Sequence, residues 1–193
     1  MGERQEFQPL TRSDRITVVL YRVGIVLSTA ILVTLAALPT ARSGLLADLL
    51  LYGLYVSGGM SVFFIHLYIG KFKVYLIYLY LFGLGCLGLL AYLGRGSLAG
   101  ALAAQPAAAL LLLPLSGCLG FVTAKEAFCF RLLEGYLLAM VLPAYLLLCG
   151  GGVLAGSAAL WGLSLIALLL VLFTLRKVFM PLAYDIGDKT AYR

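Results

Sequence analysis

Charged residues are scarce in this sequence. They make up 11% of the 193 residues, whereas an ordinary soluble domain carries roughly 25%. Hydrophobic residues make up 63%, and a small soluble domain cannot hide that much apolar surface because a large share of its residues stays exposed. The composition therefore excludes an ordinary soluble enzyme domain, a disordered chain and a nucleic-acid binder, and it predicts a protein that crosses a membrane several times.

Histidine and cysteine are scarce too. The single histidine, His66, excludes any site that needs two histidine ligands, a bis-histidine haem included. None of the four cysteines belongs to a CxxC pair, and each lies in or beside an apolar run, so we interpret them as small buried hydrophobes rather than as disulfides or zinc ligands. These are Cys86, Cys118, Cys129 and Cys149. An HExxH helix, a glycine-rich phosphate loop and a paired acidic motif within a span are also missing.

The apolar residues form long continuous runs. A spanning helix needs about 20 apolar residues, and a membrane β-barrel would instead show polar and apolar residues in alternation. We therefore predict an all-α bundle of about six transmembrane helices in a single membrane domain, residues 1–193. It comprises a polar N-terminal segment 1–15, six spans within 16–175, and a tail 176–193, with a loop at Arg95–Gln105. The expected spans are Ile16–Leu38, Leu45–Ile69, Val74–Leu93, Pro106–Ala124, Leu132–Cys149 and Val153–Leu175.

Lysine and arginine are distributed unevenly among the connections. Of the 14 such residues, only Arg42 and Arg95 fall in the first and third connections, and the fifth has none. The other twelve lie in the N-terminal segment with the first turn, the second and fourth connections and the tail. Because cytoplasmic segments carry an excess of Lys and Arg, this pattern predicts that both termini are cytoplasmic.

A polar cluster is expected near the cytoplasmic ends of the spans. Ionisable residues are costly within a membrane, roughly 2.5–3.5 kcal/mol at its centre, so those just inside the apolar runs are candidates for a site that binds a head group, an ion or a proton. The alternative is snorkelling and structural ion pairing at the interface. The candidate residues are Arg22, His66, Lys125, Glu126, Arg131 and Glu134.

Three of these candidates carry specific hypotheses. Glu134 lies three residues after Arg131, so a continuous helix would pair them, with Arg22 or His66 as alternative partners. His66 can also ligate a pigment as a neutral imidazole. We predict no other cofactor and no metal site.

The tail holds a second candidate interaction site. Asp185 and Asp188 flank a glycine that predicts a turn, and Lys189 follows. Two carboxylates alone would hold a divalent cation weakly, because hard cations take more oxygen ligands.

Small residues four apart indicate close helix packing. The pairs Gly53/Ser57 and Gly135/Ala139 predict helix contacts that a leucine would disrupt. A three-plus-three inverted repeat, with helix interruptions at Gly58–Gly59 and Pro143, is a further hypothesis that would indicate a transporter.

Three strings carry a family resemblance: Lys125–Phe130 (KEAFCF), Tyr184–Lys189 (YDIGDK) and the segment His66–Tyr68 (HLY). Together they resemble an uncharacterised integral membrane protein family of cyanobacteria, over most of the chain. The resemblance implies a multi-pass protein in the plasma or thylakoid membrane of a phototroph, and it brings no activity with it.

The leading functional hypothesis is a non-enzymatic helper or subunit that binds another membrane component, with the lipid bilayer, a second membrane protein and no nucleic acid as its partners. Polar residues gather on one side, yet no catalytic set assembles. The alternative is a small-solute or ion permease that uses Arg22, His66 and Glu134. A third hypothesis is an intramembrane enzyme that uses Cys129, whose pKa the neighbouring Lys125 would lower.

Overall fold

The computed structural model describes residues 11–38, 44–67 and 69–186, and over these residues it contains helices and no strand. Six helical segments are long and apolar enough to cross a membrane. They are α1 (Arg12–Ala37), α2 (Gly44–Phe64), α3 (Gly70–Leu93), the 3-10 helix η2 (Pro106–Leu112) continued by α5 (Leu113–Phe130), α6 (Leu133–Gly150) and α7 (Gly156–Val178). Two helices are short, α4 (Leu98–Ala104) and α8 (Ala183–Ile186). The prediction of an all-α, six-helix membrane bundle is confirmed.

One connection differs from the prediction. The segment Arg95–Gln105 contains the helix α4 instead of being a loop throughout. Ser97 caps this helix by accepting a hydrogen bond from the Gly100 amide at 3.0 Å, and the Asp48 carboxylate on α2 accepts one from the Ala99 amide at 2.8 Å. Leu98 is buried against the bundle. A helix of seven residues is too short to show a clear helical period of apolar residues in the sequence. Its support comes partly from a carboxylate of another helix, which the local sequence does not reveal.

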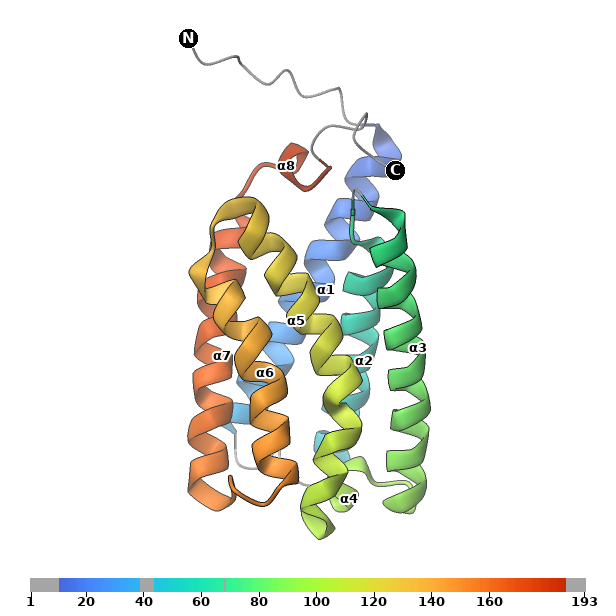
Figure 1. The fold of residues 1–193 in the computed structure, drawn as a ribbon, viewed down its shortest axis with the longest axis vertical. Helices are drawn as coiled ribbons and strands as arrows, with labels where there is room; N and C mark the ends of the chain where they lie inside the picture. Colours follow the sequence, from blue (N-terminus) through green and yellow to red (C-terminus); the bar gives the residue numbers. More distant parts are fainter. Residues whose placement is uncertain (1–10, 39–43, 68, 187–193) are drawn as a thin grey trace.

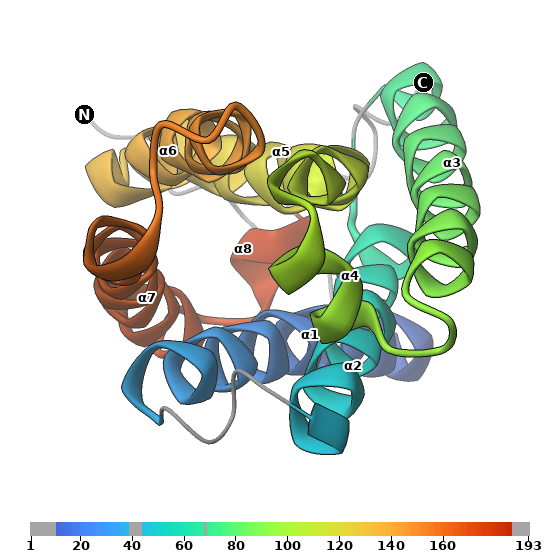
Figure 2. The same ribbon diagram turned by 90° about the horizontal axis from the view of Figure 1, so that it is seen from below.

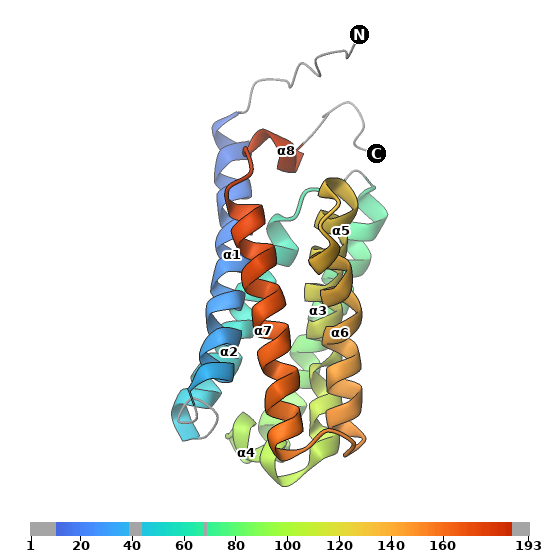
Figure 3. The same cartoon turned by 90° about the vertical axis from the view of Figure 1, so that its left-hand side faces the viewer.

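The long helices form a ring. Seen along the bundle (Figure 2), α1, α2, α5, α6 and α7 surround the centre, and α3 lies outside, against α2 and α5. The start of α1 and the whole of α8 lie at one end, and α4 and the α6–α7 connection lie at the other (Figures 1 and 3). We call these the terminal end and the distal end of the bundle. That both chain ends lie on the cytoplasmic side of the membrane stays a prediction.

Glycine allows two helices to approach closely at Gly135. A Cβ atom there would lie 2.6 Å from the backbone oxygen of Thr123, so the α5–α6 contact requires glycine. Gly53 is less constrained, because its added Cβ would meet only the Ile31 side-chain tip, at 3.2 Å. The prediction of a tight helix contact therefore suits Gly135 better than Gly53.

The proposed helix interruption in the second span does not occur. Helix α2 runs without a break through Gly58 and Gly59, and an added Cβ at Gly58 would lie 2.9 Å from the Leu115 side chain. These glycines provide room for α5 and for Tyr80. The matching interruptions expected of a transporter repeat are therefore absent at this position.

Candidate functional sites: an ionic network and an apolar cavity

Five charged side chains form a continuous cluster at the terminal end of the bundle. We call this cluster the ionic network, and its members are Arg22, Lys125, Glu126, Lys177 and Asp185. They come from α1, α5, α7 and α8, so the network joins four helices. Charges removed from water are tolerated when they are paired, and every member of this cluster has a partner of opposite charge.

Lys177 lies at the centre of the ionic network. Its side chain is 0% exposed, and its ammonium pairs with Glu126 and with Asp185. The same ammonium lies 4.3 Å from the centre of the Phe130 ring, which adds a cation–π contact. One cation therefore connects a carboxylate of α5 with a carboxylate of α8.

Arg22 holds the C-terminal segment onto the bundle. Its guanidinium binds the Asp185 carboxylate, with Nη2 2.6 Å and Nε 2.7 Å from Oδ2. It also donates to the backbone oxygens of Met180 at 2.6 Å, Val178 at 3.1 Å and Pro181 at 3.2 Å. The planar guanidinium suits several acceptors at once, so this residue ties α1 to α8 and to the turn before it.

Glu126 is buried and receives two further contacts. The Lys125 ammonium lies 2.7 Å from its Oε1, and the Tyr21 hydroxyl donates to the same oxygen at 2.8 Å. Lys125 also lies over the Tyr21 ring, at 5.7 Å from its centre. The Glu126 carboxylate thus has donors from α1, α5 and α7.

Glu134 is paired with Arg176 and not with Arg131, which corrects our prediction. Nη1 of Arg176 lies 2.9 Å from both carboxylate oxygens of Glu134. Arg131 cannot share a helix face with Glu134, because α5 ends at Phe130 and α6 begins at Leu133. Arg131 itself has a φ of 54° in the left-handed region and ends α5 as an exposed residue.

His66 lies in the short connection between α2 and α3, outside the ionic network. Its Nε2 is 3.3 Å from the Thr17 hydroxyl, and its Nδ1 is buried without a hydrogen-bond partner among the described residues. Partial burial lowers the pKa of His66, and the positive charges of Lys73 and Lys125 lower it further. The neutral imidazole is therefore favoured in the folded protein.

The structure thus divides the candidate residues among several places. It brings Arg22, Lys125, Glu126 and Asp185 together, and it puts His66, Arg131 and Glu134 elsewhere. Asp188 and Lys189 lie outside the described residues. Within the described part of the chain, no group of three or more His, Cys, Asp or Glu side chains is placed to hold a metal ion.

Lys177, the central residue of the ionic network, is not among the candidate residues predicted from the sequence. It falls in the tail predicted over residues 176–193. A signal was present, because the buried residues of α7 recur at spacings of four, three and four, and Lys177 continues that series. The series is Ile166, Leu170, Phe173 and Lys177. Leucines also occupy many of the positions between these residues, so the buried face of α7 does not differ clearly in hydrophobicity from its other faces.

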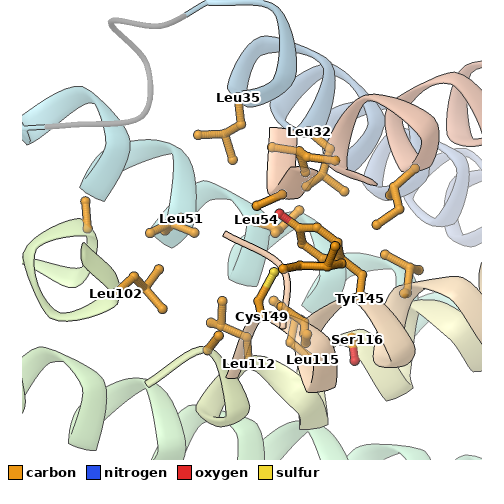
Figure 4. A pocket seen from close by; sticks show the side chains of 18 of the residues that line it. Leu32, Leu35, Leu51, Leu54, Leu102, Leu112, Leu115, Ser116, Tyr145 and Cys149 are labelled. Atoms are coloured by element: carbon orange, nitrogen blue, oxygen red, sulfur yellow. The ribbon is translucent and has the colours of Figure 1, made fainter. Parts of the chain in front are cut away.

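The distal half of the bundle contains a large apolar cavity. Its volume is about 510 Å³, and it lies between α1, α2, α4, η2, α5, α6 and α7. No lining residue is charged. The lining is mostly leucine and alanine, and Figure 4 shows residues of α1, α2, α5 and α6 converging on it, among them Leu32, Leu54, Leu115 and Cys149.

Few polar groups reach this cavity. Its lining includes the hydroxyl-bearing residues Tyr55, Ser116 and Tyr145. In Figure 4 the Tyr145 side chain extends from α6 towards Leu54 on α2. Ser116 donates to the Leu113 backbone oxygen at 2.8 Å. Such a pocket, apolar with a small number of polar groups, is typical of sites for small hydrophobic molecules.

Residues 60–193 match the family described as Uncharacterized integral membrane protein (DUF2301). The chain belongs to this family. The protein is thus an integral, multi-pass membrane protein that sits in a lipid bilayer. The family match covers Lys125, Glu126, Lys177 and Asp185 of the ionic network and leaves Arg22 outside. No curated protein and no solved structure is similar enough to match.

Proposed function

We propose that the protein binds a lipid-soluble component of the membrane in the distal cavity without transforming it chemically. The cavity itself carries this proposal: its volume of about 510 Å³ lies within the usual range of ligand sites, about 300–1,000 Å³. Its uncharged lining favours an apolar molecule over an ion or a polar solute, because polar groups lose hydration on entering such a site.

The apolar walls of the cavity support an occupant. The cavity is partly open to its surroundings rather than sealed, and side chains that face unfilled space lose van der Waals contacts. An apolar molecule drawn from the surrounding bilayer would restore the missing van der Waals contacts.

The ionic network supports a structural role at the other end. Each of its three cations and two carboxylates is already paired with a group of opposite charge within the protein, so they offer little unpaired charge to a passing solute. A permease remains our alternative, because buried charges in a membrane often mark ion or proton paths. A proton- or ion-dependent flux in proteoliposomes, lost in Glu126→Gln, would favour the permease over the binding protein.

The binding proposal can be tested by photo-crosslinking. A long-chain alkane that bears a diazirine is added to the purified protein in detergent, and the mixture is irradiated. Mass spectrometry then maps the residues to which the alkane has become attached. We expect attachment to cavity residues such as Leu54 and Leu115, in addition to the lipid-facing surface. Ala109→Phe, which places a ring at the buried cavity wall, should abolish the cavity signal.

The control is Ala30→Phe, the same change at an exposed position of α1. It should leave attachment to the cavity unchanged. Cavity labelling that persists in Ala109→Phe at the wild-type level, or labelling of the lipid-facing surface alone in the wild type, would contradict the proposed binding.

A further inference from the structure

We infer that the short helix α4 is a movable lid at the mouth of the cavity, and that Asp48 of α2 is the latch that holds this lid in place. This inference rests on the proposed function and adds how an apolar molecule enters and leaves the site. Helix α4 forms part of the cavity wall through Ala99, Leu102 and Ala103. In Figure 4 the Leu102 side chain extends from α4 towards Leu51 of α2.

The mouth of the cavity lies at the distal end of the bundle, beside α4. The lining residues Leu115 and Ile166 are buried, at 3% and 1% exposed. The lining residues Ala103, Pro106 and Gly156 are exposed instead. They belong to α4, to the start of η2 and to the start of α7, so the cavity opens between these elements. A displacement of α4 would therefore widen the opening.

Helix α4 is packed separately from the main core. Its buried side chains, Leu98 and Ala101, belong to a small apolar cluster that is distinct from the core of the bundle. Gly96 precedes the helix with a φ of 95°, and Gln105 follows it in an extended conformation. Such residues at the ends of an element absorb its rotation. Because segments with few buried apolar contacts open at a lower free energy than the core does, α4 can move while the ring of long helices stays intact.

Asp48 supplies a polar contact that fixes the position of α4. Its Oδ1 accepts a hydrogen bond from the Ala99 amide at 2.8 Å and one from the Ser97 hydroxyl at 3.4 Å. Asp48 is 8% exposed, and hydrogen bonds to a charged group are stronger than those between neutral groups. When α4 moves away, the carboxylate loses both donors, so Asp48 favours the closed position of the lid.

The test measures how fast two maleimides of different size alkylate Cys149, a lining residue whose sulfur is visible in Figure 4. Mass spectrometry follows the modification of Cys149 itself in the purified protein, so the other cysteines stay in place. The bulky reagent is pyrene maleimide and the small one is methyl maleimide. In Asp48→Ala we expect the bulky reagent to react about tenfold faster than in the wild type, which is the shift that one lost hydrogen bond to a charged group produces. The rate of the small reagent should change little.

Two further variants make the test specific to α4. Glu134→Ala is the matched control, because Glu134 is also an 8% exposed carboxylate but pairs with Arg176 at the terminal end. It should leave both rates unchanged. Ser97→Ala removes the side chain that caps α4 and should accelerate the bulky reagent as Asp48→Ala does, so the inference can be tested even if Asp48→Ala does not fold.

The outcomes separate this inference from the proposed function. If the photoreactive alkane labels the cavity but neither Asp48→Ala nor Ser97→Ala accelerates the bulky reagent, α4 is not the lid and apolar binding stands. Equal acceleration in Glu134→Ala would also overturn the lid, because any loss of stability would then open the cavity. If the alkane labels only the lipid-facing surface of the wild type, the proposed function itself fails, and this inference falls with it.

Discussion

Replacing Lys177 by methionine tests whether the ionic network holds the terminal end of the bundle together. Methionine keeps an unbranched apolar side chain, one atom shorter than that of lysine, and removes the charge. The change leaves Glu126 with Lys125 and leaves Asp185 with Arg22. Two carboxylates that are almost fully buried would then each lose one of their cations.

The expected loss of stability follows from this burial. Removing one partner of a buried ion pair costs about 3–5 kcal/mol, because the survivor keeps its desolvation cost without its attraction. Since each carboxylate keeps one cation, we expect the lower end of that range, about 3 kcal/mol. The assay measures the temperature at which the purified protein unfolds in mild detergent. Unfolding is monitored by the loss of the helical circular dichroism signal.

Arg176→Met is the matched control, one residue earlier on the same helix. Arg176 is 55% exposed in its side chain, whereas its partner Glu134 is 10% exposed. Because one end of this pair stays in water and Lys177 is fully buried between two carboxylates, Arg176→Met should cost less than Lys177→Met. The double variant Lys177→Met with Glu126→Gln should recover part of the loss, because it removes a stranded charge. Equal effects of Lys177→Met and Arg176→Met, or strict additivity in the double variant, would refute the reasoning.

Three other predictions concern packing, pH and topology. Gly135→Ala should lower the unfolding temperature, since its Cβ would lie 2.6 Å from a backbone oxygen, whereas Gly85→Ala, with no atom within 4 Å, should leave it unchanged or raise it slightly; equal effects would argue against the α5–α6 contact. Because the pKa of His66 is lowered on folding, the unfolded state binds more protons, so the stability of the protein should fall as the pH drops below about 6.5. In His66→Gln the unfolding temperature should depend less on pH across that range. An unchanged pH dependence would exclude His66 as the cause. In a cysteine-free background, an impermeant thiol reagent should label Arg95→Cys but not Arg131→Cys on intact cells, and labelling of the latter from outside would reverse the predicted topology.

Much of the architecture could be predicted from local sequence. The continuous apolar runs were enough to predict six spanning helices, because a helix satisfies its own backbone hydrogen bonds and needs only length and hydropathy. The short helix α4 was missed, since Asp48 of α2 supplies an acceptor for its first turn. Glu134 was assigned the wrong partner for a related reason: the pairing rule assumed a continuous helix, and the left-handed Arg131 separates α5 from α6.

By itself, the sequence determined the membrane class, the number of spans and the presence of scarce charges near one side, because these depend on composition along the chain. Only the tertiary structure decided which charges meet. Lys177 lies 51 residues after Glu126 and becomes its partner only when α5 and α7 carry them to the same end of the bundle. The cavity is likewise a property of the packing: its leucines resemble the lipid-facing leucines in sequence, and what separates the two groups is the ring of helices that encloses one of them.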